Sequence, residues 1–188
     1  MVLIAHESDK KHLMQTSTAI GLGDPQARFR VYVAKHPPMQ EYTGLVDVQP
    51  LGRGEIDSIN QACGNGWRKL FNVYAKLVFA LDANRFGFNQ LASSWQYYRD
   101  QHLLQAGSNT ALLFSTPQLN PADQMIHIIA GRTHAKHLLS QGLAAQLNWL
   151  DHEFAIDSSN RLLVCPYFDY RQLNNEKLAR LAELLKEL

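Results

Sequence analysis

The segment Arg161-Leu-Leu-Val-Cys-Pro-Tyr-Phe-Asp-Tyr-Arg-Gln-Leu-Asn-Asn-Glu-Lys-Leu-Ala-Arg-Leu-Ala-Glu-Leu-Leu-Lys-Glu-Leu188 predicts a strand, a loop and a helix in succession. Leu162–Cys165 is a continuous apolar run typical of a strand buried on both faces, and Pro166 ends it because proline lacks an amide hydrogen. After a polar and aromatic loop, Asn174 or Asn175 can cap a helix whose leucines recur on one face. In open α/β sheets, ligands bind beside the loops that follow the carboxyl ends of strands, so this unit also predicts the location of a site.

Three earlier segments have the composition of strands. Residues 28–34 alternate apolar and polar side chains and are rich in strong β-formers. Residues 110–114 form an apolar run that ends at Ser115, and residues 125–130 form the most strand-like run, which Gly131 breaks. The first strand has an alternative position at residues 18–22.

Helices are predicted between these strands. From residue 67 to residue 81, apolar side chains recur at i, i+3, i+4, i+7, i+10, i+11 and i+14, which is the spacing of an amphipathic helix on a core. Residues 95–101 predict a shorter aromatic helix. Thr133 can cap another helix that extends to about Gln141, where Gly142 closes it.

The order of these elements predicts an α/β fold. The expected architecture is a single three-layer domain with a mainly parallel sheet of about four strands flanked by helices. The domain is expected to cover residues 1–188, with residues 1–17 as a loosely ordered lead-in or a short helix. A chain of 188 residues with 46% apolar residues is long enough to bury one hydrophobic core.

The composition excludes several classes of function. A net charge of +1 provides no overall field for nucleic acid or an anionic membrane, although a local basic patch is compatible with it. Cys63 and Cys165 lack the paired spacing of a metal or redox site and are expected to be reduced, mostly buried thiols. Residues 1–5 are apolar but too few for a signal peptide or a membrane span, so we expect a soluble, cytoplasmic protein. No cofactor or metal is implied.

Polar or glycine-containing segments follow all four predicted strands. Because the carboxyl ends of parallel strands share one edge of a sheet, these segments are expected to form one binding site. Gly131 and Thr133 are first of all suited to capping a helix, and the functional alternative is an anion held at the helix N-terminus with help from Arg132. The candidate binding residues are Lys35, His36, Ser115, Thr116, Gly131, Arg132, Thr133, His134, Tyr167, Asp169, Tyr170 and Arg171.

The aromatic loop after the last strand has two interpretations. Tyr167, Phe168 and Tyr170 either cover the edge of the sheet or form a stacking surface beside a cation. Proteins that hold single-stranded bases use surfaces of the second kind.

Motifs of specific chemistry are incomplete. His134 and His137 are three residues apart on one predicted helix, but no metal-binding signature accompanies them, which favours a structural or surface role. Ser115 lacks the Gly-x-Ser-x-Gly elbow of common hydrolases. Cys165 could act as a nucleophile, yet nothing in the sequence places a histidine beside it.

Residues 125–131 and 163–178 resemble the last two strand and helix units of the uracil-DNA glycosylase superfamily. In that family a His-Pro-Ser-Pro-type loop enters DNA from the second of these units. Here Cys165 stands in the place of the family's histidine beside the retained Pro166, and Gly21-Leu-Gly-Asp-Pro25 echoes the family's water-activating Gly-Gln-Asp-Pro motif. The resemblance implies a fold more than an activity. The chain as a whole also resembles an uncharacterised bacterial family.

Three functions remain open. The first is a nucleic-acid or nucleotide-binding protein of glycosylase-like fold, with or without glycosylase activity, which requires a basic and aromatic surface at the strand ends. The second is an enzyme acting on a small molecule in the same cleft, which requires a deeper apolar pocket and a titratable residue such as Asp169 or His36. The third is a structural or interaction protein. The oligomeric state is not implied.

Overall fold

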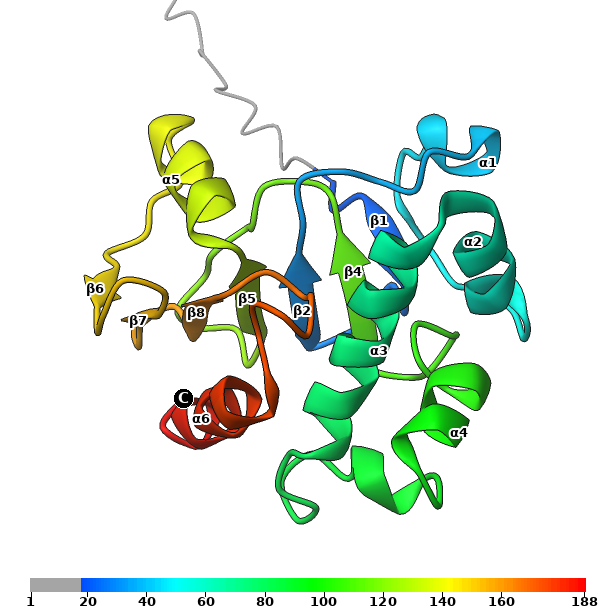
Figure 1. Cartoon of the computed structure of the whole chain (residues 1–188). Helices are drawn as coiled ribbons and strands as arrows, with labels where there is room; N and C mark the ends of the chain where they lie inside the picture. The colour runs from blue at the N-terminus through cyan, green and yellow to red at the C-terminus, as the bar shows by residue number, and fades with distance from the viewer. Residues whose placement is uncertain (1–17) are drawn as a thin grey trace, which may run out of the picture.

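One sheet of eight strands organises the computed structural model, which describes residues 18–188 (Figure 1). The expected lead-in of residues 1–17 lies outside the described residues. The strands are β1 (Gly21–Gly23), β2 (Phe29–Tyr32), β3 (Val48–Gln49), β4 (Thr110–Leu113), β5 (Ile126–Ala130), β6 (Asn148–Trp149), β7 (Ala155–Asp157) and β8 (Leu162–Cys165). The helices are α1 (Gln40–Thr43), α2 (Glu55–Cys63), α3 (Asn65–Phe79), the 3-10 helix η1 (Phe88–Gln90), α4 (Trp95–Gln101), α5 (Arg132–Ser140) and α6 (Asn175–Lys186).

The centre of the sheet consists of four parallel strands in the order β4, β2, β5 and β8. These are the four strands that the alternation of residues 28–34 and the three apolar runs predict. The expectation of about four strands is nevertheless wrong, because β1 and β3 extend the sheet beyond β4, and β7 and β6 extend it beyond β8. β1 runs antiparallel to β4 and β7 antiparallel to β8, so the sheet is mixed.

Glycine allows β1 to approach β4 closely. A Cβ atom at Gly21 would lie 2.2 Å from the carbonyl oxygen of Leu112, and one at Gly23 would lie 2.4 Å from that of Thr110. Only glycine avoids such overlaps. The two alternative positions for the first strand are therefore both occupied by strands, with β2 in the parallel centre and β1 outside it.

Helices cover both faces of the sheet. The buried side chains of α3 and α6 share one hydrophobic core with Phe29, Val31 and Leu163, whereas α5 packs with Tyr32 on the opposite face. The predicted helix over residues 67–81 is observed two residues earlier, as α3. Its fully buried residues are Leu70, Phe71, Tyr74, Ala75, Leu77 and Val78.

The parallel strands cross the sheet in the order second, first, third and fourth along the chain. After β2 and β8, the chain continues to helices on the face that carries α3 and α6, but after β5 it continues to α5 on the other face (Figure 1). Where the connections after two neighbouring parallel strands run to opposite faces of the sheet, a crevice forms at the carboxyl ends of these strands. Ligands bind in this crevice in open α/β sheets.

Two local features of the helices bear on the site. Asn174 caps α6 as predicted, because its Oδ1 accepts a 3.0 Å hydrogen bond from the amide of Lys177. Thr133, by contrast, is not the cap of α5, since the helix begins at Arg132 and Gly131 occupies the N-cap position. Among residues 18–188, no helix combines the length and the apolar character needed to cross a bilayer.

Candidate functional site

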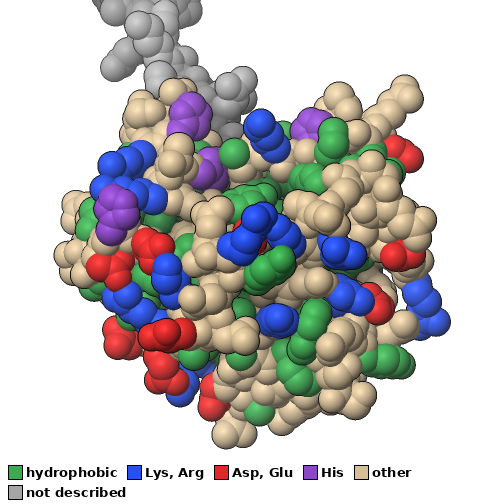
Figure 2. All heavy atoms as spheres, in the orientation of Figure 1, with side chains coloured by type: hydrophobic (Ala, Val, Ile, Leu, Met, Phe, Trp, Pro, Cys, Tyr) green, Lys and Arg blue, Asp and Glu red, His purple; other side chains and the backbone are tan. Residues whose placement is uncertain are grey.

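A cavity of about 630 Å³ lies at the carboxyl ends of β2, β5 and β8. Its position is the one that the divergence of the chain after these strands predicts. Figure 2 shows histidine side chains gathered over α5 at the upper left of the molecule, where this cavity lies. The residues that line it are Ala34, Ala130, Gly131, Arg132, Thr133, His134, His137, His152, Glu153, Pro166, Tyr167 and Gln172.

Gly131 connects β5 to α5 at one wall of the cavity. It has a φ of 102°, which glycine adopts more readily than other residues, and its amide donates a 2.8 Å hydrogen bond to the carbonyl of Cys165 in β8. The N-cap residue, Gly131, has no side chain to cap α5, and among residues 18–188 no side chain is observed to accept a hydrogen bond from the first-turn amides of this helix. Such an N-terminus carries partial positive charge and free N–H donors, which together attract anions.

Arg132 adds a full positive charge to the same wall. Its Nη1 donates a 2.6 Å hydrogen bond to the carbonyl oxygen of His152 and lies 3.0 Å from Nδ1 of that residue. Its guanidinium also lies 4.8 Å from the centre of the Trp149 ring. Within the part of the chain that the structure describes, no carboxylate is within ion-pair distance of Arg132. No acid among the described residues therefore neutralises its charge.

The turn between β6 and β7, residues 150–154, forms the outer wall. Asp151 forms an ion pair with Arg180 of α6, and Glu153 forms another at 2.7 Å with Lys177 of the same helix. Burial alone would raise the pKa of Asp151, but hydrogen bonds from Arg180 and from two backbone amides lower it to about 2. The turn is thus held by α6 on one side and by Arg132 on the other.

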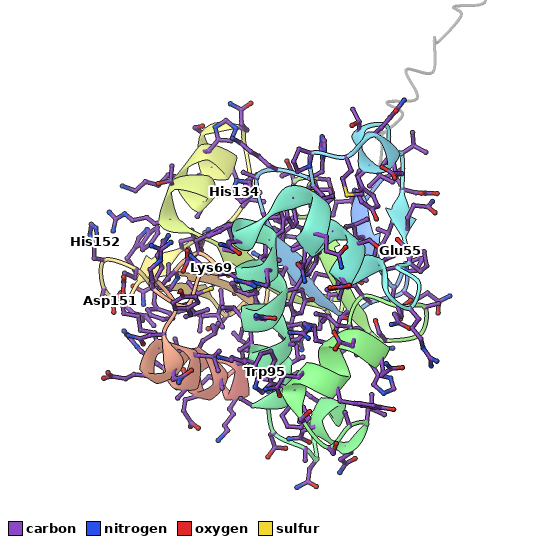
Figure 3. All side chains as sticks on the ribbon, turned by 45° about the vertical axis from the view of Figure 1, so that its right-hand side comes forward. Glu55, Lys69, Trp95, His134, Asp151 and His152 are labelled. Atoms are coloured by element: carbon purple, nitrogen blue, oxygen red, sulfur yellow. The ribbon has the colours of Figure 1, made fainter. Side chains whose placement is uncertain are left out.

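Three histidines contribute imidazoles to the cavity. His134 and His137 come from α5, and His152 comes from the turn opposite; Figure 3 shows His134 and His152 on the same side of the molecule. Nε2 of His134 is buried and has no hydrogen-bond partner among the described residues. Burial lowers the pKa of His134, and the nearby His137 lowers it further, so this imidazole is neutral at neutral pH. No group of three metal-ligating side chains is present within residues 18–188.

Tyr167 is the residue of the aromatic loop that faces the cavity. Burial raises the pKa of its hydroxyl, and the Asp169 carboxylate raises it further. Phe168 is fully buried beneath the loop and packs against the Tyr74 ring with centroids 5.8 Å apart. Phe168 therefore has a covering role, whereas Tyr167 faces the cavity and is available to a ligand.

The remaining members of the loop form a separate surface cluster. Asp169 pairs with Lys69 of α3 at 3.3 Å and with Arg171 at 3.5 Å. The Arg171 amide, with Lys69 and the Arg171 side chain, holds the pKa of Asp169 below its ordinary value against the effect of burial. Tyr170 is 55% exposed, and Lys69 Nζ lies 5.0 Å from the centre of its ring. These three loop residues do not line the cavity.

The candidate residues after β2 and β4 are also outside the cavity. Lys35 is exposed, and His36 Nδ1 donates a 2.7 Å hydrogen bond to the carbonyl of Pro37. Ser115 Oγ accepts a 3.0 Å hydrogen bond from the amide of Ile20, which fixes the chain before β1. The exposed Thr116 follows it. In the segment that follows β2, Ala34 is the residue that lines the cavity.

Asp24 and Cys165, the two positions compared with functional residues of the glycosylase family, do not line the cavity. Because β1 is antiparallel to β4, Asp24 lies beside the first residue of β4, at the opposite edge of the sheet. Its carboxylate accepts hydrogen bonds from the amides of Gln26 and Asn109. Cys165 is fully buried within β8, and burial raises the pKa of its thiol, which favours the protonated, unreactive form.

His152, Glu153 and Gln172 line the cavity without having been predicted. His152 and Glu153 lie on an antiparallel turn, to which the rule about parallel strand ends does not apply. Their only signal in the sequence is the polar run Asp151-His-Glu153 between Leu150 and Phe154. His137, for which the sequence favours a structural or surface role, also lines the cavity.

Comparison with known proteins identifies a family. Neither the curated proteins nor the solved structures contain a significant match to this chain. The model of DUF6942, a family of unknown function, matches residues 20–186. This range includes every strand and helix from β1 to α6, and with them all the residues that line the cavity. The chain therefore belongs to the DUF6942 family.

Proposed function

We propose that the cavity at the carboxyl edge of the sheet binds a small molecule that carries a phosphate group, of about the size of a mononucleotide. The observation that carries this proposal is the uncapped N-terminus of α5 at the cavity wall, where Arg132 adds a charge that no described carboxylate neutralises. Backbone amides, a helix dipole and a guanidinium are the groups that hold phosphates in proteins.

The size and the walls of the cavity support a ligand larger than phosphate alone. Its 630 Å³ falls within the usual range of about 300–1,000 Å³ for small-molecule sites. Ala34, Ala130 and Pro166 provide apolar walls, and Tyr167 provides a ring against which a planar group can stack. The negative charge of Glu153 does not oppose an anion strongly, because Lys177 pairs with it.

A nucleotide is favoured over an extended nucleic acid. Binding of a single nucleic-acid strand would require the basic and aromatic residues at the carboxyl ends of the β-strands to form one continuous surface. Lys35 and Arg171 are both outside the cavity, and Arg171 is paired with Asp169. The net charge of +1 adds no general attraction for a polyanion.

The proposal does not include base excision, the activity of the glycosylase superfamily that the sequence resembles. Asp24, which would correspond to the water-activating aspartate, lies at the opposite edge of the sheet from the cavity. Cys165, in the place of the family's histidine, is buried below the cavity floor formed by Pro166. We therefore propose a binding site in an α/β fold without that chemistry.

His134 favours a second candidate function, an enzyme that acts on the bound molecule. Its neutral imidazole lines the cavity, and Nε2 is buried without a hydrogen-bond partner among residues 18–188. An unpartnered imidazole in a cavity can accept a proton from a ligand or from water, which is the role of a general base.

Isothermal titration calorimetry with AMP, adenosine and inorganic phosphate tests the binding proposal. The wild-type protein should bind AMP, and adenosine should bind about tenfold more weakly because it lacks the phosphate. Arg132→Gln should weaken AMP binding by about tenfold. Lys136→Gln is the matched control, since Lys136 is exposed on the same helix and does not line the cavity. Absence of binding to both AMP and inorganic phosphate at millimolar concentrations would contradict the proposal.

A further inference from the structure

A second cavity lies at the opposite edge of the sheet, where β2, β5 and β8 begin. Its volume is about 240 Å³, and Arg28, Arg85 and Arg161 all line it. In Figure 1 this is the lower edge of the sheet, away from α5. The other residues that line it are Phe29, Phe86, Asn109, Gln124, Ile126 and Leu188.

Two of the three arginines donate hydrogen bonds to oxygens of the backbone. Arg85 Nη1 donates hydrogen bonds to the carbonyls of Leu185 and Lys186 at 2.8 and 3.2 Å, which fastens the end of α6. Arg161 donates to an oxygen of Leu188 at 3.3 Å and to the carbonyl of Asp123 at 2.5 Å. The acceptors on Leu185, Lys186 and Asp123 are uncharged backbone carbonyls.

The guanidinium of Arg28 has no partner of this kind. Its side chain makes no hydrogen bond or ion pair with another residue in the range 18–188, although its backbone amide bonds to Asn109. Over the same range, no Asp or Glu carboxylate lies within ion-pair distance of Arg85 or Arg161. Like charges gathered around one small cavity repel one another unless an anion enters it.

The backbone at this cavity provides a second, separate observation. Arg161 has a φ of 48°, in the left-handed region that glycine and asparagine adopt more readily than arginine. Asn109, which also lines the cavity, has a φ of 60°. A glycine at position 161 would remove this strain, but it would also remove the guanidinium from the cavity. Residues held in such conformations are concentrated at functional sites.

From these observations we infer that the arginine cavity is an oxyanion-binding site, distinct from the proposed nucleotide site. Its ligand is a small phosphate-type anion such as pyrophosphate, because arginine forms paired hydrogen bonds with phosphate oxygens. The volume of 240 Å³ is below the usual range of about 300–1,000 Å³ for sites that hold drug-sized molecules, which favours a compact anion. The inference does not depend on the function proposed for the first cavity.

Calorimetric titration with sodium pyrophosphate tests this inference. We expect the wild-type protein to bind pyrophosphate, and Arg28→Gln to weaken the binding by about tenfold. Arg28 is the informative position because its side chain fastens no other element, so the substitution should not unfold the protein. Arg68→Gln is the matched control, because Arg68 is an exposed arginine of α3 outside both cavities.

A third variant separates the two cavities. Arg132→Gln should leave pyrophosphate binding at the arginine cavity unchanged, because Arg132 lies at the other edge of the sheet. If Arg132→Gln abolishes the binding and Arg28→Gln does not, pyrophosphate binds in the first cavity and the inference is overturned. It is also overturned if the wild type does not bind pyrophosphate, in which case Arg85 and Arg161 serve only to hold the end of α6.

Discussion

The guanidinium of Arg132 donates a 2.6 Å hydrogen bond to the backbone carbonyl of His152. The two residues are 20 positions apart in the chain, on α5 and on the turn between β6 and β7. This bond joins two walls of the larger cavity that no strand or helix connects directly. A ligand phosphate at the N-terminus of α5 would therefore be close to the residue that holds the turn.

Substitution of Arg132 should loosen the turn between β6 and β7 as well as weaken ligand binding. In Arg132→Gln, we expect the amides of Leu150 and Phe154 to exchange with solvent about tenfold faster, because a charge-assisted hydrogen bond no longer holds the turn. The Leu150 amide donates a 2.9 Å hydrogen bond to the carbonyl of Phe154, so its exchange reports on the closed turn. Hydrogen exchange measured by mass spectrometry checks this. Unchanged exchange would show that the ion pairs of Asp151 and Glu153 with α6 are sufficient to hold the turn closed.

Asp151 should stabilise the protein in a pH-dependent manner. Its pKa is lowered from 3.8 to about 2 in the folded state, so its contribution is present above pH 3.8 and is lost as the pH falls toward 2. Because its side chain is 38% exposed, we expect Asp151→Asn to lower the unfolding free energy by only about 0.5–1 kcal/mol at neutral pH. Urea denaturation over this range checks it: a difference between the two proteins that stays constant down to pH 2 would be inconsistent with an ionised Asp151.

The parallel centre of the sheet is predictable because its strands are buried on both faces. β4, β5 and β8 are largely apolar runs with a glycine, a proline or polar residues at the end, as in Ile126–Ala130 before Gly131, whereas β2 shows an alternation of apolar and polar residues. β3 and β6 have two residues each, and β1 has glycine at two of its three positions. Segments of this length have no measurable periodicity, and they become strands only because a neighbouring strand already exists.

The residues of the candidate site are predictable only where the segment that directly follows a strand lines the cavity. Arg132, Thr133 and His134 reach the cavity because they begin the helix that directly follows β5. His36 follows β2 equally directly, yet its ring turns toward Phe114, with centroids 6.2 Å apart. The position at the end of a strand indicates the edge of the sheet, whereas the direction of each side chain depends on contacts with residues far away in sequence.

His127 should make the fold sensitive to mild acid. It is 1% exposed in β5, and Tyr32 Oη lies 2.7 Å from its Nδ1. Burial, reinforced by the nearby Arg30, lowers the pKa of His127 from 6.5 to about 4, so the unfolded state binds a proton more readily between these values. The free energy of unfolding therefore falls as the pH falls from 6.5 to about 4, by roughly 3 kcal/mol in all.

The variant His127→Gln isolates this effect, because glutamine does not titrate. Urea denaturation at several pH values should show a smaller loss of stability between pH 6.5 and 4 than in the wild type. His134, whose pKa is also lowered, should cause part of the loss that remains in the variant. Parallel curves for the two proteins would mean that His127 does not titrate in this range.

Leu77 tests the core beneath α3. It is fully buried in the cluster that also contains Phe71 and Leu112. We expect Leu77→Ala to lower the unfolding free energy by about 2–5 kcal/mol, because the substitution leaves a cavity in a closely packed core. Arg68→Ala, on the exposed side of the same helix, should change it by less than about 0.5 kcal/mol. Urea denaturation of both variants checks this, and a similar small effect for both would contradict the packing of α3.

Tyr167 and Tyr170 distinguish a nucleotide site from a strand-binding surface. Tyr167 lines the cavity, whereas Tyr170 is 55% exposed beside Lys69 and outside the cavity. If the ligand is a mononucleotide, Tyr167→Ala should weaken AMP binding by about tenfold through lost stacking, and Tyr170→Ala should leave it unchanged. If the ligand is single-stranded DNA, both tyrosines and Arg171 should contribute, at about 1–3 kcal/mol for each stacked base.

The same variants, with Arg171→Ala, can be compared by calorimetry with AMP and by fluorescence anisotropy with a labelled oligonucleotide at two salt concentrations. Binding to the oligonucleotide should weaken steeply as the salt concentration rises, since each phosphate contact releases counterions. We expect no salt-dependent binding of the oligonucleotide at micromolar protein, because Arg171 is paired with Asp169 and Lys35 lies away from the cavity. Oligonucleotide binding that requires both Tyr170 and Arg171 would instead identify the exposed loop as the functional surface, and the cavity would then have to be assigned another role.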